Sequence, residues 1–300
     1  MVSAIILSYN RCAEVLLTID KLKNYRKIIP FELEIIVIDN ASVDDTSIQV
    51  KTYHPELTLI TKIKNNGIAG WNDGFKVARN KYFLVLDDDS HIISGLPEAV
   101  KRMEAQPDIG ILPFQIKDRD LNTDPDLDPE KAWKDKEDVV GFIGCGALIK
   151  RDLYKKIGGF AEWIYLYTHE FEYSIRCLDA GYRINFFGEG IIIHRVSNIN
   201  RSNKRIRIFA TRNEMLIIHK YFKNDKAKYL FRILINNLKF IKREGLMSGI
   251  YILQGFLKYL QLKSKLELTP VSLKIQNYYA DNFWSTKPIF TNKNDNKLNK

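Results

Sequence analysis

The chain has 300 residues, 45% of them hydrophobic and 27% charged, as is usual for a globular protein with a sizeable core. No apolar run approaches the roughly 20 residues needed to cross a bilayer, which excludes an integral protein built on membrane helices. The net charge of +10 is uneven, because residues 195–300 hold 22 Lys/Arg against 6 Asp/Glu. This basic third suggests an anionic partner, for which the candidates are a membrane surface, nucleic acid and an anionic substrate.

Two features indicate the compartment. Residues 2–7 form an apolar run without the basic flank of a signal peptide, and they predict a buried strand instead. The three cysteines, Cys12, Cys145 and Cys177, are far apart and match no zinc or disulfide spacing. We therefore expect a reduced, cytosolic setting.

Strand-like and helix-like segments alternate over the first 90 residues. Residues 13–25 carry apolar side chains at helical spacing, and Asp44 opens a second helical segment. Further strands are predicted at 33–38, 57–63 and 82–86. This alternation predicts an α/β fold with a Rossmann-like, mostly parallel sheet.

The predicted strands end in polar or glycine residues, at the sheet edge where ligands bind in such folds. The chain lacks both G-x-G-x-x-G after the first strand and the phosphate loop G-x-x-x-x-G-K-[ST], so a nucleotide would be held in another way. The fourth strand ends in three mutually repelling carboxylates, Asp87, Asp88 and Asp89. On these residues alone two interpretations remain: a divalent cation with oxygen ligands, or a solvated turn that caps the next helix.

Residues 98–106 predict a helix and 109–112 a strand, whereas the charged, proline-containing segment 117–138 predicts a surface loop. Small residues around Gly144 indicate close approach of a backbone or a ligand. The remaining predicted elements of this half are a helix at 151–157, a helix that contains Glu170 and runs to Ala180, and short strands at 181–184 and 191–194.

The basic third predicts helices at 208–221, around 229–241 and at 246–262, with apolar, aromatic and Lys/Arg side chains mixed. Such a mixture is typical of helices on a membrane surface, and the alternative is packing on the rest of the protein with solvated charges. No recognition motif supports nucleic acid. The Asn/Lys-rich residues from about 285 predict a disordered tail.

Several of these segments occur in an order that resembles family 2 glycosyltransferases. In the first half they are Ile6–Asn10, Val37–Thr46, Asn65–Gly67 and Leu86–Asp89. In the second half they are Ile157–Phe160, Tyr165–Glu170, Arg176, Ala180–Tyr182 and His194. The resemblance covers about residues 3–196. It implies a GT-A fold with an acceptor-side extension, a nucleotide-diphosphate sugar as donor, and inversion of the anomeric centre.

On this basis we expect a GT-A catalytic domain at 1–196, with a nucleotide-sugar half at 1–97 and an acceptor half at 98–196. A basic amphipathic helical region at 197–284 and a tail at 285–300 would follow.

The resemblance also implies roles for single residues. Donor-binding residues would be Ser8, Tyr9, Asn10, Asp39, Asn66, Gly67 and Asp88, with Asp39 at the base or ribose. Asp87 and Asp89 match the family's D-x-D metal motif, for Mg²⁺ or Mn²⁺. His194 falls where some members place a metal or diphosphate contact. Glu170 takes the position of the general base, although His169-Glu170 replaces the usual Glu-Asp pair.

Each role has a structural alternative. Asp39 is also suited to cap a helix, Glu170 to pair with Arg176 on a helix face, and His194 to satisfy a polar strand end.

The resulting prediction is a metal-dependent inverting hexosyltransferase of bacterial polysaccharide biosynthesis, acting on a lipid-linked or cell-surface glycan. It would work in the cytoplasm, at the inner face of the membrane if residues 197–265 contact lipid. A non-catalytic nucleotide-sugar-binding component of a synthase complex is one alternative, which the His169-Glu170 departure keeps open. The other is a sugar-phosphate nucleotidyltransferase, which needs a basic phosphate loop that Ser8–Arg11 matches poorly.

Overall fold

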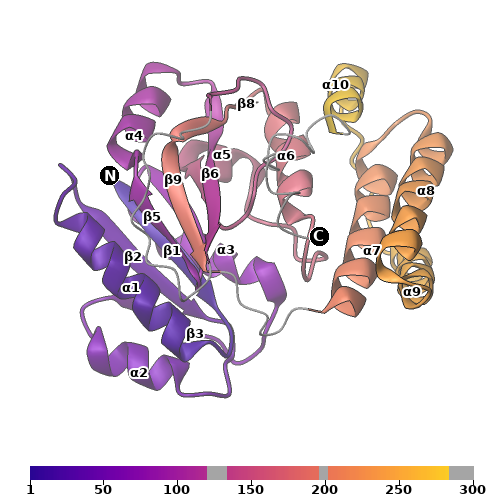
Figure 1. The fold of residues 1–300 in the computed structure, drawn as a ribbon. Helices are drawn as coiled ribbons and strands as arrows, with labels where there is room; N and C mark the ends of the chain where they lie inside the picture. Colours follow the sequence, from indigo (N-terminus) through magenta and orange to yellow (C-terminus); the bar gives the residue numbers. More distant parts are fainter. Residues whose placement is uncertain (120–133, 196–201, 284–300) are drawn as a thin grey trace.

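The computed structural model describes residues 1–119, 134–195 and 202–283 (Figure 1). Its first elements follow the predicted alternation, and the apolar runs at 2–7, 33–38 and 82–86 are confirmed as strands. In chain order they are β1 (Val2–Ser8), α1 (Cys12–Arg26), β2 (Leu33–Asp39), α2 (Thr46–Tyr53), β3 (Thr58–Thr61), the 3₁₀ turn η1 (Gly67–Gly70), α3 (Trp71–Val77) and β4 (Tyr82–Asp87).

The second half adds five strands and completes one sheet. These are β5 (Ser90–Ser94), β6 (Ile109–Arg119), β7 (Ala147–Lys150), β8 (Arg183–Ile184) and β9 (Phe187–Arg195). The described strands lie in the order β3-β2-β1-β4-β7-β6-β9-β5, and β8 pairs with β6. Pairing is parallel from β3 through β4, whereas β7 runs antiparallel to both β4 and β6. The sheet is therefore mostly parallel, as predicted, with an inversion between its two halves.

Alternate side chains of a strand point to opposite sides of the sheet. Since both sets are apolar here, helices cover both faces. On β1, Ile5 packs in a core cluster with residues of α3, α5 (Arg151–Ile157) and α6 (His169–Asp179). Ala4 and Ile6 pack in a second cluster with α1 and α4 (Leu96–Ala105). The strand ends that carry the polar residues are thereby held between two buried layers.

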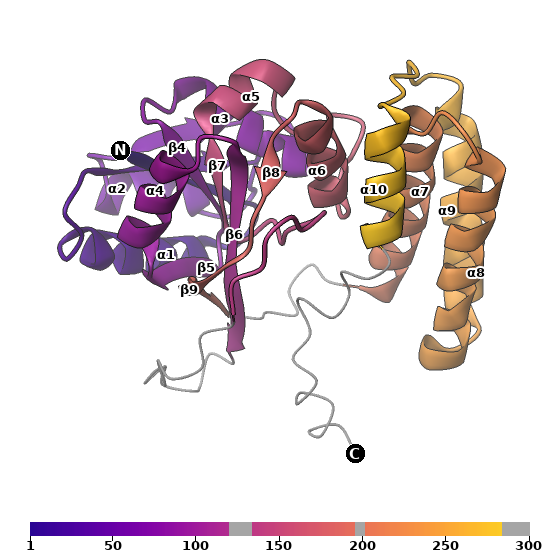
Figure 2. The ribbon, with the colours of Figure 1, turned by 90° about the horizontal axis from the view of Figure 1, so that it is seen from above.

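The basic third forms α7 (Asn203–Tyr221), α8 (Lys226–Glu244), α9 (Met247–Lys263) and α10 (Leu273–Phe283). Figure 2 shows α7 and α10 beside α6, with α8 and α9 farther from the sheet. The Tyr221 hydroxyl of α7 donates to Glu172 of α6, whose carboxylate also pairs with Arg176 at 2.7 Å. In the described part of the chain, no helix is long and apolar enough to cross a membrane.

Several expectations are wrong in detail. The turn formed by Asp88 and Asp89 leads into β5, not into a helix, so the three aspartates cap no helix. The strand β6 continues through Lys117 and Asp118, where a loop was expected, because these residues pair with β9. β9 also begins earlier than the predicted 191–194. Most of the predicted loop, at 120–133, and the predicted tail from 285 lie outside the described residues.

Candidate functional site

The three aspartates lie at the carboxyl end of β4. Asp87 is the last residue of the strand, and Asp88 and Asp89 form the turn into β5. The Ser90 hydroxyl holds this turn, since it accepts from the Asp87 N–H at 2.9 Å and donates to the Asp87 carbonyl oxygen at 3.2 Å. Asp88 and Asp89 are 4% and 1% exposed, so their charges need partners inside the protein.

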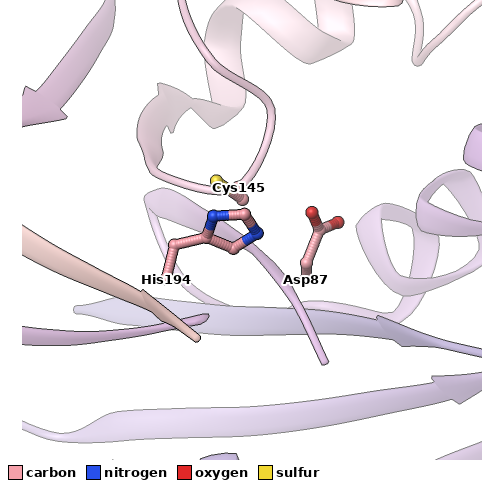
Figure 3. Close-up of side chains that lie close together, drawn as sticks. All are labelled: Asp87, Cys145 and His194. Carbon is pink, nitrogen blue, oxygen red and sulfur yellow. The ribbon is translucent and has the colours of Figure 1, made fainter. Parts of the chain in front are cut away.

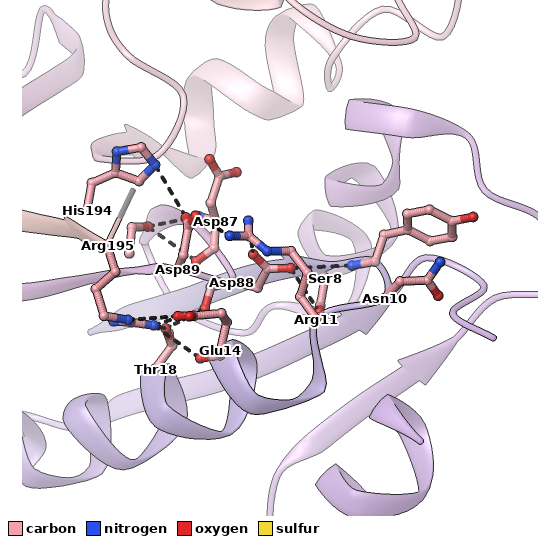
Figure 4. Close-up of polar contacts among 12 residues, drawn as sticks. Ser8, Asn10, Arg11, Glu14, Thr18, Asp87, Asp88, Asp89, His194 and Arg195 are labelled. Atoms are coloured by element: carbon pink, nitrogen blue, oxygen red, sulfur yellow. Dashed lines mark hydrogen bonds and ion pairs between the residues drawn. The ribbon is translucent and has the colours of Figure 1, made fainter. Parts of the chain in front are cut away.

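Arg11, directly after β1, bridges two of the carboxylates. Its Nη1 donates to Asp88 Oδ1 at 3.0 Å, and its Nη2 lies 2.8 Å from Asp89 Oδ2. The other Asp88 oxygen accepts from the Ser8 hydroxyl at 3.1 Å and from the Tyr9 N–H at 3.4 Å (Figure 4). Asp88 thus faces the end of β1, and Asp89 shares the Arg11 guanidinium with it.

Burial and mutual repulsion make the cluster costly to ionise. Burial, together with the charge of Asp89, raises the pKa of Asp87 to about 6. Burial raises the pKa of Asp88 to about 8, although Arg11 opposes the change. An additional cation at this strand end would stabilise the ionised form of these carboxylates.

His194 of β9 approaches the cluster from the opposite half of the sheet. Its Nε2 lies 3.4 Å from Asp89 Oδ1, and its Nδ1 lies 2.7 Å from Asp118 Oδ1 of β6. Burial lowers the pKa of His194, but Asp118, Asp89 and Asp87 outweigh that effect and raise it. The second carboxylate on Nδ1 would orient the ring for a ligand at Nε2, as is common for metal-binding histidines.

Cys145 is an addition to the site residues named from the sequence. Ligand atoms of Asp87, Cys145 and His194 lie within 4.8 Å of one another (Figure 3). Burial, reinforced by Asp87, holds the pKa of the Cys145 thiol well above its usual range. Because only the thiolate is a good metal ligand, the donors that fit a hard cation here are the carboxylates and the imidazole.

Arg195, beside His194, holds the backbone of the Asp88–Asp89 turn (Figure 4). Its guanidinium pairs with Glu14 of α1 at 2.9 Å and donates to Thr18 Oγ1 at 2.6 Å. Both Thr18 and Arg195 also donate to the Asp88 carbonyl oxygen, at 2.6 and 3.3 Å. The backbone that carries the aspartates is therefore tied to α1 and to β9.

Glu170 lies in the first turn of α6, close enough to Asp87 for its charge to raise the pKa of Asp87. Its Oε1 accepts from the Gly144 N–H at 3.2 Å, and a Cβ at Gly144 would stand only 3.2 Å from the same oxygen. The close neighbours of Gly144 are thus the side chains of His169 and Glu170, where a backbone or a ligand was expected. The alternative pairing of Glu170 with Arg176 is wrong, because Arg176 binds Glu172.

His169 stands where the usual Glu-Asp pair has its glutamate, and its side chain lies beside Glu170. The His169 ring is buried, with its centroid 5.6 Å from that of Trp71 and 5.1 Å from that of Phe160. Burial lowers the pKa of His169, so the ring is neutral at pH 7. Its Nδ1 lies 3.2 Å from Glu170 Oε2, so the neutral ring packs against the carboxylate.

A cavity of about 230 Å³ opens between the end of β1 and the segment before α6. Of the predicted donor-binding residues, Ser8, Tyr9, Gly67 and Asp88 line it, together with Asp87. The other lining residues are Leu7, Arg11, Asn40, Asn65, Ile68, Trp71, Tyr165, Leu166, Tyr167 and Arg205.

The remaining predicted donor-binding residues lie outside this lining. The Asp39 carboxylate accepts from the Ser42 N–H at 2.9 Å and from the Ser47 hydroxyl. The Asn10 side-chain oxygen accepts from the Val43 N–H at 2.8 Å. Both residues thus hold the loop after β2 in this structure. Asn66 keeps a buried side-chain oxygen without a hydrogen-bond partner among the described residues.

Gly67 joins the two halves of the cavity wall. Its φ is +63°, and a Cβ placed on it would lie 1.8 Å from the Tyr165 carbonyl oxygen. The neighbouring Ile68 N–H donates to that oxygen at 3.0 Å. The Gly67 carbonyl oxygen in turn accepts from the Asn40 side chain at 2.9 Å. Only glycine combines this backbone conformation with this contact.

Sequence reasoning missed Arg11 and Arg205. Arg11 follows the Ser8-Tyr9-Asn10 segment directly, so its place at a strand end was a signal that could have been used. Arg205 lies about 200 residues away in sequence, in the first turn of α7, and only the folded chain brings it to the cavity.

Known proteins similar to this chain include glycosyltransferases. The sequence model described as glycosyl transferase family 2 matches residues 3–158. An uncharacterized glycosyltransferase of Methanocaldococcus jannaschii is 27% identical over 186 residues, which is 58% of this chain and 63% of that protein. An uncharacterized glycosyltransferase of Haemophilus influenzae is 27% identical over 171 residues, 54% of this chain and 56% of that protein. The chain therefore spans less than two thirds of the length of these relatives.

Among solved structures, the mannosyltransferase PcManGT from Pyrobaculum calidifontis, in complex with GDP-Man and Mn²⁺, has a TM-score of 0.57 at 20% identity. The match covers 96% of this chain and 81% of that one. S. aureus TarS 1-349 in complex with UDP-GlcNAc has a TM-score of 0.56 at 16% identity, over 95% and 91% of the two chains. At these identities the likeness shows the fold, which is the predicted GT-A fold.

The Gly67 contact leads to a prediction about stability. Gly67→Ala should lower the free energy of unfolding by more than the roughly 1–2 kcal/mol that a left-handed backbone costs an L-residue, because the methyl group also meets the Tyr165 carbonyl. Gly181→Ala is the control, since Gly181 has φ +84° but a Cβ added there would meet nothing within 4 Å. Urea unfolding of both variants measures the difference, and equal losses would contradict the role given to the Gly67–Tyr165 contact.

Proposed function

Since the chain belongs to glycosyl transferase family 2, we propose that it transfers a sugar from a nucleotide-diphosphate sugar to a hydroxyl of a glycan acceptor, with inversion of the anomeric centre. The observation that carries this proposal is that Glu170 lies close enough to Asp87 for its charge to act on that residue, which lines the cavity with Asp88. Direct displacement at a sugar carbon needs a base for the attacking hydroxyl and a site for the leaving diphosphate. In this proposal Glu170 is the base, and the aspartate cluster with a bound cation is the site for the diphosphate.

The residues present fit a divalent cation, Mg²⁺ or Mn²⁺, held by Asp87, Asp89 and His194. Carboxylate oxygens suit both ions and Mn²⁺ also accepts an imidazole, while burial and the charge of Asp89 raise the pKa of Asp87, which a bound cation would offset. The P. calidifontis neighbour, described with GDP-Man and Mn²⁺, supports the same choice. When bound, the ion would stabilise the charge that develops on the leaving diphosphate.

We place the nucleotide in the cavity that Ser8, Tyr9 and Gly67 line, with Asp88 fixed between Ser8 and Arg11. The Arg205 guanidinium would face the diphosphate from α7. The neighbours described with GDP-Man, UDP and UDP-GlcNAc support a donor of this class.

Three further residues would complete the nucleotide site. Asp39 precedes the cavity-lining Asn40 and remains the proposed contact to base or ribose. Asn66 offers its buried side-chain oxygen, and Asn10 would act by holding the loop after β2.

In the proposed reaction, the Glu170 carboxylate removes the proton of the acceptor hydroxyl while that oxygen attacks the anomeric carbon. The His169 ring lies beside the carboxylate, with Nδ1 3.2 Å from Oε2, and the Gly144 N–H donates to Oε1. The bond to the diphosphate oxygen breaks on the opposite face of the sugar. The products are the inverted glycoside and a nucleoside diphosphate, and the proton rests on Glu170.

We further propose that the acceptor is a growing lipid-linked or cell-surface glycan, built in the cytoplasm. The aromatic faces of Tyr165 and Tyr167 on the cavity wall suit stacking on sugars. A reducing compartment agrees with the three cysteines, all of which are free.

A donor panel tests the proposed function. The full chain with Mn²⁺ should slowly hydrolyse one of a set of UDP-, GDP- and dTDP-sugars, and a chelator should abolish the release of nucleoside diphosphate. Donor binding without hydrolysis or transfer would favour the non-catalytic binding component. Synthesis of a nucleotide sugar from a sugar phosphate and a nucleoside triphosphate would favour the nucleotidyltransferase.

Glu170→Gln should reduce the rate of transfer by about 10²–10⁴-fold, because the amide keeps the shape of the side chain but accepts no proton. Donor affinity, measured by calorimetry, should stay unchanged. Glu162→Gln is the control, since Glu162 is an exposed acid just ahead of the same helix. Transfer at a near-normal rate in Glu170→Gln would refute the assignment of the base.

A further inference from the structure

The helix α8 presents an apolar stripe to solvent. Phe231, Ile235 and Leu238 are 65%, 41% and 39% exposed. Their spacing of four and three residues places them on one face of the helix. Large apolar side chains that lie side by side on a surface commonly mark an interaction site.

The helix α9 presents a longer stripe of the same kind. Its exposed apolar side chains are Met247, Ile250, Leu253, Leu257 and Leu260, and the preceding Leu246 extends the row. Spacings of three and four residues again confine them to one face.

Both stripes lie on the side turned away from α7. On α8, the buried Asn237 accepts a hydrogen bond from Thr211 of α7 at 3.1 Å. On α9, Gly255 packs against the α7 backbone, where a Cβ would stand 2.7 Å from the Ile208 carbonyl oxygen. Figures 1 and 2 show α8 and α9 side by side as the layer farthest from the sheet. The two stripes therefore form one outer face.

The outer face is bordered by positive charge. Residues 226–265 contain nine Lys/Arg and a single acid, Glu244. Glu244 already pairs with Arg207 of α7 at 3.1 Å. On α8, the exposed cations next to the stripe are Lys228, Arg232, Lys239 and Lys242. An apolar strip with a basic border complements a surface that is apolar beneath an anionic layer.

We propose that the outer face of α8 and α9 docks on a lipid surface with anionic headgroups. The apolar stripes enter the boundary between headgroups and acyl chains, and the Lys/Arg border contacts the headgroup charges. A second copy of the chain is less suited to this face, because a symmetric contact would bring two basic borders together. The proposal rests on α8 and α9 and is independent of sugar transfer.

Co-sedimentation with lipid vesicles tests the proposal on the full chain. Wild-type protein should bind vesicles of phosphatidylcholine mixed with phosphatidylglycerol about tenfold or more tightly than phosphatidylcholine alone, and binding should weaken as salt rises. Leu253→Glu with Leu257→Glu should weaken binding about tenfold or more, because two charges replace the inserted side chains. Arg232→Glu with Lys239→Glu should remove the preference for the anionic lipid.

The control variant is Ile28→Glu with Ile48→Glu, which changes two apolar side chains that are 76% and 64% exposed on the catalytic body. It should bind vesicles like the wild type. Thermal melting and hydrolysis of a soluble donor should be unchanged in the leucine variant, which separates loss of docking from loss of folding or of catalysis. Wild-type protein that ignores anionic vesicles, or a leucine variant that binds them normally, overturns the proposal. A wild-type dimer that becomes monomeric in the leucine variant also overturns it, in favour of a second copy.

Discussion

Negative charge at the carboxyl end of β4 is the constraint on which the surrounding structure depends. Three consecutive carboxylates lie at the end of a buried strand, and each has a different set of neighbours. Asp88 turns to Arg11 and Ser8 at the end of β1, whereas Asp89 lies between Arg11 and His194. Burial and the charge of Asp89 raise the pKa of Asp87 to about 6, and the charge of Glu170 adds to the increase. The arrangement suits a site that is completed by a cation and an anionic ligand together.

The same strand end needs a second half of the protein to become an active site. The antiparallel strand β7 reverses the sheet, and β9 then delivers His194 beside Asp89. The Gly67–Tyr165 contact closes the cavity wall next to α6, where Glu170 begins the helix. Glu172 has no place in the proposed chemistry. It fixes α6 to α7 through its pairs with Arg176 and Tyr221.

The sequence predicted the strands β1, β2 and β4 well, because a parallel strand buried on both faces is a continuous apolar run that local pattern identifies. The positions of Ser8, Tyr9 and Asp88 at one sheet edge followed for the same reason, since these residues lie at or just after the ends of β1 and β4. β5 was missed because Ser90–Ser94 is a short run next to the aspartates, and its pairing with β9 is a contact between distant segments. The packing of His169 against Trp71 and the place of Arg205 also depend on distant contacts that no local pattern contains.

Anomalous diffraction tests the central claim most directly, with crystals of the full chain grown with Mn²⁺ and a nucleoside diphosphate. The account predicts one manganese peak among Asp87, Asp89 and His194, with the diphosphate oxygens on the cavity side of the ion. A diphosphate bound in the cavity with no manganese at this cluster would contradict the account, and so would a manganese site elsewhere on the chain.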